Sequence, residues 1–460
     1  MSIQRLKPFL PAILIFCLAL LIRILYNALV AQAYYPMYDS QAYQAIGFNT
    51  LDEHCFCLHP YITTLYRPPL WPWLIAGISL VFGRADLYDR LFLCCLGSGT
   101  CVLISLFARD LFGRRIGLIA GLIACVYPAL YLYDGWLYTE SLFTLLLTAI
   151  CYCLLRIQRD AGQRRSLWLL CGVLLALLSL TRPNGIIVLV LVVLWTLFLS
   201  WRKLLRARAS CTSVVLTALI TVLLIAPWTL RNYLVSHSFV PVATGDGTVL
   251  LGAYNDVSLT DPNTPGNWLN PLKTTPQNQR ILAPFPLYTC DAPCEIARED
   301  VSKNAAVQWI KSHLNSMPAL LVYHLRNFWT PYTREADLPM ERFPAQVSSQ
   351  VLHSMSSSFP IPIFALAALG LSVTLRRHWR ELLFPYLIIL TTLAEALVYY
   401  GSSRFRAPIE PLLVLLAAGA LWWLTQDAPG SLRQHMKIHR QKHTTSSAER
   451  TSKPLIVEKL

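Results

Sequence analysis

Residues 9–30 read FLPAILIFCLALLIRILYNALV, and the segment Tyr38-Asp39-Ser40-Gln41-Ala42-Tyr43 follows a few residues later. A helix needs about 20 mostly apolar residues to cross about 30 Å of hydrocarbon, so the run predicts a first membrane span. A carboxylate at the mouth of a span has two chemical uses: it can bind a cation, or it can take a proton from a hydroxyl group. The two segments together predict a membrane protein with chemistry just beyond its first span.

A cleaved signal peptide is the alternative interpretation of this region. Arg5 and Lys7 precede the apolar run, and Ala31-Gln32-Ala33 resembles a cleavage site. The apolar run is longer than the usual signal-peptide core of about 7–15 residues. We therefore interpret residues 9–30 as a retained span.

The composition supports a polytopic helical protein. The 460 residues are 55% hydrophobic and 14% charged, and the mean hydropathy is +0.46, which leaves too little charge to cover a soluble surface. The apolar runs are continuous, which favours helices over the alternating strands of a barrel. We predict an all-α protein with about ten spans, at 9–30, 90–108, 115–133, 138–156, 166–181, 184–201, 211–230, 359–376, 382–400 and 406–424.

The basic residues set the predicted orientation. The formal net charge is +14, but the Lys and Arg residues lie between spans, where topology explains them without nucleic acid. The apolar run 70–82 is short for a span and is flanked by prolines and tryptophans, so we place it as an interfacial helix. Basic clusters such as Arg202, Lys203, Arg206 and Arg208 then face the cytoplasm, as do both termini. The site near Asp39 is predicted to face the outside.

We predict four regions along the chain. Residues 1–230 form a transmembrane core with the first external loop, and 231–358 form a mixed external loop with an amphipathic helix around 296–329. Residues 359–424 carry the last spans. Residues 425–460 form a disordered basic tail on anionic headgroups, in which His435, His439 and His443 are interpreted as solvated rather than metal-binding.

Four of the thirteen cysteines fall in predicted external loops: Cys55, Cys57, Cys290 and Cys294. Disulfides, free thiols and a zinc site are all open for them, although the short spacings are poor for zinc. Cysteines inside spans are interpreted as small apolar side chains.

Three acidic residues are candidates for chemistry. Asp39 lies among tyrosines suited to a membrane interface or a sugar ring, and a plain loop acid is the alternative. Glu140 begins a span, where the helix dipole favours an acid, yet an acid at hydrocarbon depth is costly unless it has a use. Asp134 lies nearby and is the weaker candidate.

Arginines outside the cytoplasmic clusters need a reason of their own. Arg404 and Arg406 stand between two spans on the predicted outer side, and guanidinium groups match phosphate oxygens well. Snorkelling to lipid phosphates is the alternative. Arg67 and Arg182 have similar positions. Arg23 lies within the first span, so we expect it to face the bundle interior with a partner.

These motifs, in this order, resemble the GT-C superfamily of membrane glycosyltransferases, and most closely its protein O-mannosyltransferase and aminoarabinose transferase branch. The resemblance covers roughly residues 9–230, and its residues are Asp39, Tyr66-Arg67-Pro68-Pro69-Leu70, Leu111-Phe112-Gly113-Arg114-Arg115, Tyr127-Pro128, Leu180-Thr181-Arg182-Pro183-Asn184-Gly185 and, near the last span, Arg404-Phe405-Arg406-Ala407-Pro408. No Walker, HExxH, GxSxG or GxGxxG motif is present in the sequence, so nucleotide-driven chemistry is not indicated.

The resemblance implies an inverting transfer of a sugar from a polyprenyl-phosphate donor to an acceptor hydroxyl. Asp39 would be the general base, and Glu140 would position the acceptor or help hold a divalent cation. The donor phosphate would bind Arg404, Arg406, Arg67, Arg182 and Arg23, and the substrate would contact Tyr43, Tyr66, Asp134 and Tyr138. The acceptor, a protein, lipid or glycan, stays open. A transporter or flippase of a phosphate-bearing lipid, or a non-catalytic assembly partner, are the alternatives.

Overall fold

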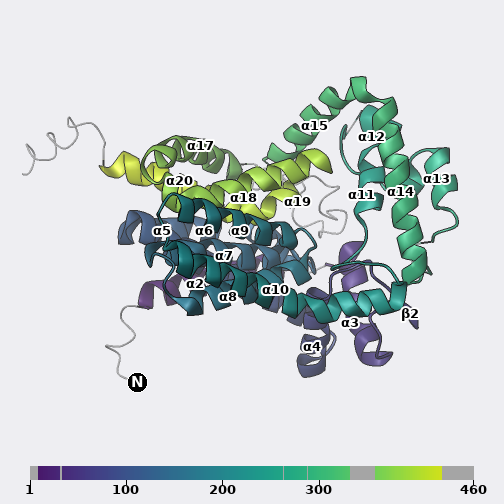
Figure 1. The fold of residues 1–460 in the computed structure, drawn as a ribbon, viewed down its shortest axis with the longest axis horizontal. Coiled ribbons are helices and arrows are strands. Elements are labelled where there is room, and N and C mark those ends of the chain that lie inside the picture. Colours follow the sequence, from purple (N-terminus) through teal and green to yellow (C-terminus); the bar gives the residue numbers. More distant parts are fainter. Residues whose placement is uncertain (1–8, 32–33, 263, 287–288, 332–357, 427–460) are drawn as a thin grey trace, which may run out of the picture.

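The protein is a bundle of α-helices with a helical extension at one end (Figure 1). The computed structural model describes residues 9–31, 34–262, 264–286, 289–331 and 358–426. The predicted tail at 425–460 lies almost wholly outside these residues, and both chain ends do. The helices of the bundle are α2 (Leu10–Leu29), α5 (Asp86–Phe112), α6 (Arg114–Val126), α7 (Glu140–Arg159), α8 (Arg165–Thr181), α9 (Gly185–Trp201), α10 (Ala207–Ser236), α17 (Pro360–Arg377), α18 (Trp379–Val398) and α20 (Glu410–Gln426).

The bundle is all-α and polytopic, as predicted. Within the described residues, seven segments are long and apolar enough to cross a membrane, and α4, α8 and α9 are shorter apolar helices. The count of ten spans is therefore not reproduced by helix length. Helix α7 lies between α5 and α8, while α20 packs against α17 and α5, so α7 and α20 form the buried centre of the bundle.

The span predicted at 115–133 is wrong in its second half. Helix α6 ends at Val126, and two 3₁₀ helices follow, η1 (Pro128–Leu130) and η2 (Leu132–Gly135). Pro128 explains the break, because a residue that precedes proline is pushed out of the α region, and Tyr127 has φ −79° and ψ 110°. The broken segment brings Asp134 beside the first span.

The helix predicted at 70–82 is present as α4 (Leu70–Phe82). It packs against α3 (Asp39–Asp52), and the buried Trp71 donates its indole N–H to the carbonyl oxygen of Leu137 at 2.9 Å. This bond ties the start of α4 to the segment that precedes α7. The start of α3 and the start of α7 are thereby held near each other.

The extension is built from the region predicted as a mixed external loop. The helix expected around 296–329 is two helices, α14 (Ala292–Ser312) and α15 (Met317–Trp329), separated by η4 (Leu314–Ser316). Pro318 stands at the start of α15, where a missing N–H costs nothing, and it could not continue a longer helix. The other elements here are α11 (Asp246–Ala253), α12 (Asp256–Thr260), η3 (Pro271–Lys273) and α13 (Pro276–Leu282).

A short hairpin in the loop between α2 and α4 anchors the extension. Strands β1 (Cys57–His59) and β2 (Ile62–Thr63) pair antiparallel. The buried Glu295 of α14 accepts hydrogen bonds from the hydroxyl of Thr64 at 2.6 Å and from the backbone N–H of Leu65 at 2.7 Å. Burial raises the pKa of Glu295, which these two bonds oppose. Because Tyr66 and Arg67 follow directly, α14 helps to fix their position.

The four loop cysteines take the disulfide alternative. Cys55 pairs with Cys57, and Cys290 pairs with Cys294. The first bridge lies at the base of the hairpin and the second at the start of α14, so each bridge is local. Neither bridge joins the hairpin to the extension, and the hydrogen bonds of Glu295 make that connection.

Candidate active site

Five charged side chains from distant parts of the sequence meet at one end of the bundle. They form a continuous chain of ion pairs in the order Arg67, Asp39, Arg404, Glu140, Arg182. We call these five residues the charged cluster. Sequence analysis singled out all five, and the structure brings them together.

Asp39 begins α3 and lies between two arginines. Its Oδ1 contacts Nη2 of Arg67, and its Oδ2 lies 2.8 Å from Nη1 of Arg404. The preceding residue, Tyr38, has φ +53°, a backbone conformation that costs energy for a side chain other than glycine and is often found at functional sites. The side chain of Asp39 keeps 24% of its surface exposed, so a ligand can reach it.

Glu140 is the buried member, with 1% of its side chain exposed. Its Oε1 contacts Nε of Arg404 and lies 2.6 Å from Nη2 of Arg182. Its Oε2 is buried and has no hydrogen-bond partner among the described residues. Arg182 stays in place through a second bond, from its Nε to the hydroxyl of Thr139 at 2.8 Å.

Local sequence explains where the arginines stand. Helix α8 ends at Thr181, and Arg182 is extended with φ −149° because Pro183 follows it. Arg67 precedes Pro68 and Pro69, which lead into α4. Arg404 lies on the one-turn helix α19 (Ser403–Arg406), whose first turn is capped by Ser402.

Tyrosine rings line the cluster. The guanidinium of Arg404 lies 4.3 Å from the ring centre of Tyr138, and that of Arg67 lies 4.1 Å from Tyr66 and 5.2 Å from Tyr43. These contacts hold the two guanidinium groups in place. Sequence analysis missed two residues of this site, Thr139 and Arg298. The guanidinium of Arg298, on α14, lies 5.5 Å from the ring centre of Tyr66. Thr139 adjoins Glu140, whereas nothing in the sequence pointed to Arg298.

The cluster has an excess of positive charge. Three guanidinium groups and two carboxylates give a formal +1. The guanidinium groups of Arg67 and Arg404 hold the pKa of Asp39 well below its usual range, despite partial burial. A divalent cation does not fit this arrangement, since both carboxylates face guanidinium groups, and no group of three or more His, Cys, Asp or Glu side chains suited to a metal occurs in the described ranges.

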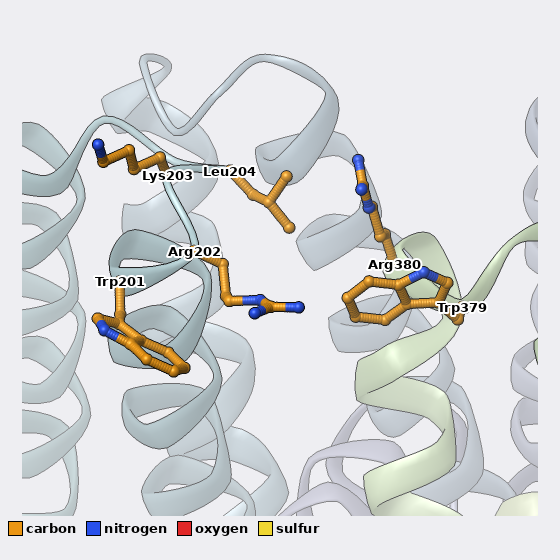
Figure 2. Close-up of a pocket in the computed structure, with 6 residues that line it drawn as sticks. All are labelled: Trp201, Arg202, Lys203, Leu204, Trp379 and Arg380. Carbon is orange, nitrogen blue, oxygen red and sulfur yellow. The ribbon is translucent and has the colours of Figure 1, made fainter.

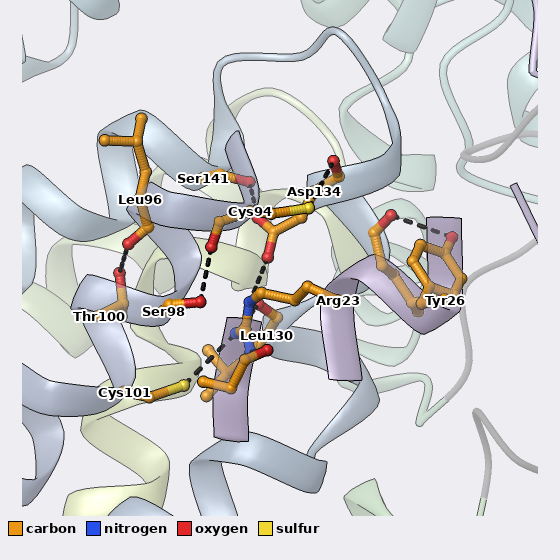
Figure 3. A network of polar contacts seen from close by, with 12 residues as sticks. Arg23, Tyr26, Cys94, Leu96, Ser98, Thr100, Cys101, Leu130, Asp134 and Ser141 are labelled. Atoms are coloured by element: carbon orange, nitrogen blue, oxygen red, sulfur yellow. Dashed lines mark hydrogen bonds and ion pairs between the residues drawn. The ribbon is translucent and has the colours of Figure 1, made fainter. Parts of the chain in front are cut away.

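Arg23 and Asp134 pair with each other (Figure 3), and neither is paired with a residue of the charged cluster among the described residues. The Nε of Arg23 lies 2.6 Å from Oδ2 of Asp134, and both side chains are buried. Arg23 also donates to the carbonyl oxygen of Leu130 at 3.0 Å, while Asp134 accepts from the hydroxyl of Ser141 at 2.5 Å. The expectation of a partner for Arg23 inside the bundle is confirmed. This network joins α2 to η2, and its bonds within the protein do not favour the predicted role of Arg23 and Asp134 in substrate binding.

Arg406 is also separate from the cluster. It is buried, with Nε 2.5 Å from Oε1 of Glu410, and it donates to the carbonyl oxygens of Phe328 and Thr330. The hydroxyl of Tyr127 donates to the other oxygen of Glu410 at 2.7 Å. Arg406 thus joins the end of α15 to the start of α20 through its Nε and Nη1.

Comparison with known proteins supports this architecture. The family model described as dolichyl-phosphate-mannose-protein mannosyltransferase matches residues 66–228, which include Arg67, Glu140 and Arg182. The structure resembles the Archaeoglobus fulgidus oligosaccharyltransferase AglB in complex with an inhibitory peptide and a dolichol-phosphate. The TM-score is 0.52 at 12% identity, over 98% of this chain and 53% of that one. The chain has the GT-C fold.

Two further solved structures also match the chain. The apo form of the A. fulgidus oligosaccharyltransferase matches with a TM-score of 0.54 at 14% identity, over 92% of this chain and 52% of that one. ArnT from Cupriavidus metallidurans bound to undecaprenyl phosphate matches with a TM-score of 0.40 at 14% identity, over 89% and 77% of the two chains. The chain spans about half the length of the archaeal proteins. No curated protein matches it.

Proposed function

We propose that this protein is an inverting glycosyltransferase. It moves a sugar from a polyprenyl-phosphate donor to an acceptor hydroxyl at the outer face of the membrane, with the charged cluster as its active site. The convergence of Asp39, Glu140 and three arginines at one end of the bundle carries the proposal. The GT-C fold and the match to a mannosyltransferase family model support it. A multi-pass membrane protein is the setting that a lipid-linked donor needs.

The charge of the cluster suits a phosphodiester. One phosphodiester group carries a single negative charge, which balances the formal +1 of the five residues. Arginine binds phosphate oxygens through paired N–H groups, and both Arg67 and Arg404 are partly exposed. The donor phosphate is therefore proposed to bind at Arg67 and Arg404, with Arg182 behind them.

Donor binding would also activate Asp39. With both oxygens held by guanidinium groups, Asp39 is a weak base. A phosphate that takes over Arg404 and Arg67 releases those oxygens and raises the pKa of Asp39 towards its ordinary value. Asp39 thus becomes an effective base only when the donor is bound, so it does not deprotonate an acceptor hydroxyl in the absence of the donor.

The chemical step then follows without a cofactor. Asp39 takes the proton of the acceptor hydroxyl, and the oxygen forms a bond to the anomeric carbon from the face opposite the phosphate. The bond between that carbon and the phosphate oxygen breaks, and polyprenyl phosphate leaves with the electron pair. Arg404 and Arg67 stabilise the added charge on the leaving phosphate. The free Oε2 of Glu140 is proposed to accept a hydrogen bond from a substrate hydroxyl.

Release of polyprenyl phosphate tests this function directly. The purified full chain would be given a panel of polyprenyl-phosphate sugars with an extract of candidate acceptors. We expect release from one donor or a small group of donors. A folded protein that releases polyprenyl phosphate from no donor would contradict the proposal and favour a transporter or flippase.

The pH dependence of transfer tests the activation of Asp39. In the free enzyme its pKa is depressed, so the ionised form persists below the ordinary value of about 4. The acid limb of kcat/KM reports the free enzyme, and that of kcat reports the donor complex. We therefore expect the kcat limb at a higher pH than the kcat/KM limb. If the acid limbs of kcat and kcat/KM coincide, the proposal that the donor phosphate draws Arg67 and Arg404 away from Asp39 is contradicted.

A further inference from the structure

A pocket lies at the end of the bundle opposite the charged cluster. This pocket of about 330 Å³ opens where α9 ends and α18 begins, and it is lined by Trp201, Arg202, Lys203, Leu204, Trp379 and Arg380. This volume is within the range of small-molecule sites, about 300–1,000 Å³. Figure 2 shows Arg202 extending from the end of α9 towards Trp379 and Arg380 on the facing helix.

The lining residues are cationic and aromatic. Three of them carry positive charge and none is acidic. Arg202, Lys203 and Arg380 form no ion pair with any carboxylate in the part of the chain that the structure describes. Glu381 follows Arg380 in the sequence but does not line the pocket. The charge of the pocket is therefore available to an anion.

The backbone of α18 adds to this preference. The helix begins at Trp379 and has no side-chain cap, so the N–H groups of its first turn stay free of bonds within the helix. The N-terminus of a helix favours negative charge. A hydrogen bond of 3.1 Å from the side chain of Gln158 on α7 to the carbonyl oxygen of Arg380 holds this end in place.

An apolar stripe leads from the pocket along α9. Val190, Leu194, Leu197 and Trp201 follow at spacings of four, three and four residues, so they share one face of the helix, and all four are exposed. An acyl chain can lie along this stripe while a phosphate sits at Arg202 and Arg380. A soluble phosphate compound would have no use for the stripe.

We propose that this pocket binds the phosphate headgroup of an anionic phospholipid, with one acyl chain along the exposed face of α9. Arg202 and Arg380 contact the phosphate, and Trp201 and Trp379 lie at the level of the lipid headgroups. The site is at the end of the bundle away from the charged cluster, so it is independent of the sugar donor. Inorganic phosphate shares the headgroup chemistry but lacks the chain.

The test compares two double variants of the full chain after delipidation. Arg202→Gln/Arg380→Gln removes two cations of the pocket. Arg115→Gln/Arg165→Gln is the matched control, because it removes two exposed cations from the same end of the bundle that do not line the pocket. Binding of phosphatidylglycerol, phosphatidylcholine and inorganic phosphate is measured by native mass spectrometry and by the shift in thermal unfolding.

We expect the unmodified chain to bind phosphatidylglycerol more tightly than phosphatidylcholine. Each cation near an anionic lipid surface strengthens binding by about fivefold, so the pocket variant should bind phosphatidylglycerol about 25-fold more weakly. The control variant should change little. An equal loss in the control would overturn the site, since it would indicate general attraction to a basic surface. Equal stabilisation by inorganic phosphate alone would overturn the lipid as the ligand.

Discussion

Asp39→Asn is expected to lower sugar transfer by about 10²–10⁴-fold, the range that a general base contributes. Asparagine keeps the size of the side chain, and it can still accept a hydrogen bond from Arg67 or Arg404, but it cannot take the acceptor proton. Release of polyprenyl phosphate from the preferred donor is the measurement. Thermal unfolding, measured in parallel, separates lost chemistry from lost structure.

Asp52 supplies the matched control for this variant. It ends the same helix that Asp39 begins, and it also pairs with an arginine, Arg84, but both side chains are largely exposed. An exposed ion pair contributes about 0–1 kcal/mol, so Asp52→Asn should leave both transfer and stability close to their original values. Near-normal transfer by Asp39→Asn would show that another residue is the general base. The assignment of the fold would stand.

Arg404→Gln and Arg406→Gln should fail in different ways. Arg404 contacts both carboxylates of the charged cluster, so its loss should reduce transfer by about 10²–10³-fold, as the removal of one charge-stabilising donor does in other enzymes. Arg406 contacts Glu410 instead, and its loss leaves a buried carboxylate without its cation. Breaking a buried pair in this way costs about 3–5 kcal/mol of folding free energy.

Two measurements distinguish these outcomes. Donor titrations should show the larger defect in Arg404→Gln, while thermal or denaturant unfolding should show the larger defect in Arg406→Gln. A donor-binding defect in Arg406→Gln with normal stability would restore the phosphate-binding role that its sequence position suggested. Equal donor binding by Arg404→Gln and the unmodified chain would remove Arg404 from the proposed phosphate site.

Local sequence was sufficient for the elements whose signals are local. The apolar run before Asp39 predicted α2, and the short run flanked by prolines and tryptophans predicted α4 at its observed bounds. The errors arose where a proline acts against an apolar pattern. Pro128 ends α6 early although the apolar run continues across it, and Pro318 starts a new helix inside the segment predicted as a single amphipathic helix.

The charged residues show where local information ends. Arg23, in a span, had to have a partner because an unpaired charge in hydrocarbon is costly, but the sequence did not reveal that the partner is Asp134. The family resemblance implied a substrate contact for Asp134 instead. Asp134 reaches Arg23 because the helix breaks after Val126, which places η2 against α2.

The sequence by itself determined the membrane class, the helical content and the residues whose charge required an explanation, because hydropathy and helix period are properties of neighbouring residues. The tertiary structure decided which of those residues act together. Arg404 and Arg406 are two positions apart on a single helical turn, so they point to different sides, one towards Asp39 and Glu140, the other towards Glu410. Glu410 follows Arg406 by four residues, whereas only the packing of distant helices brings Asp39 and Glu140 to the other side of that turn.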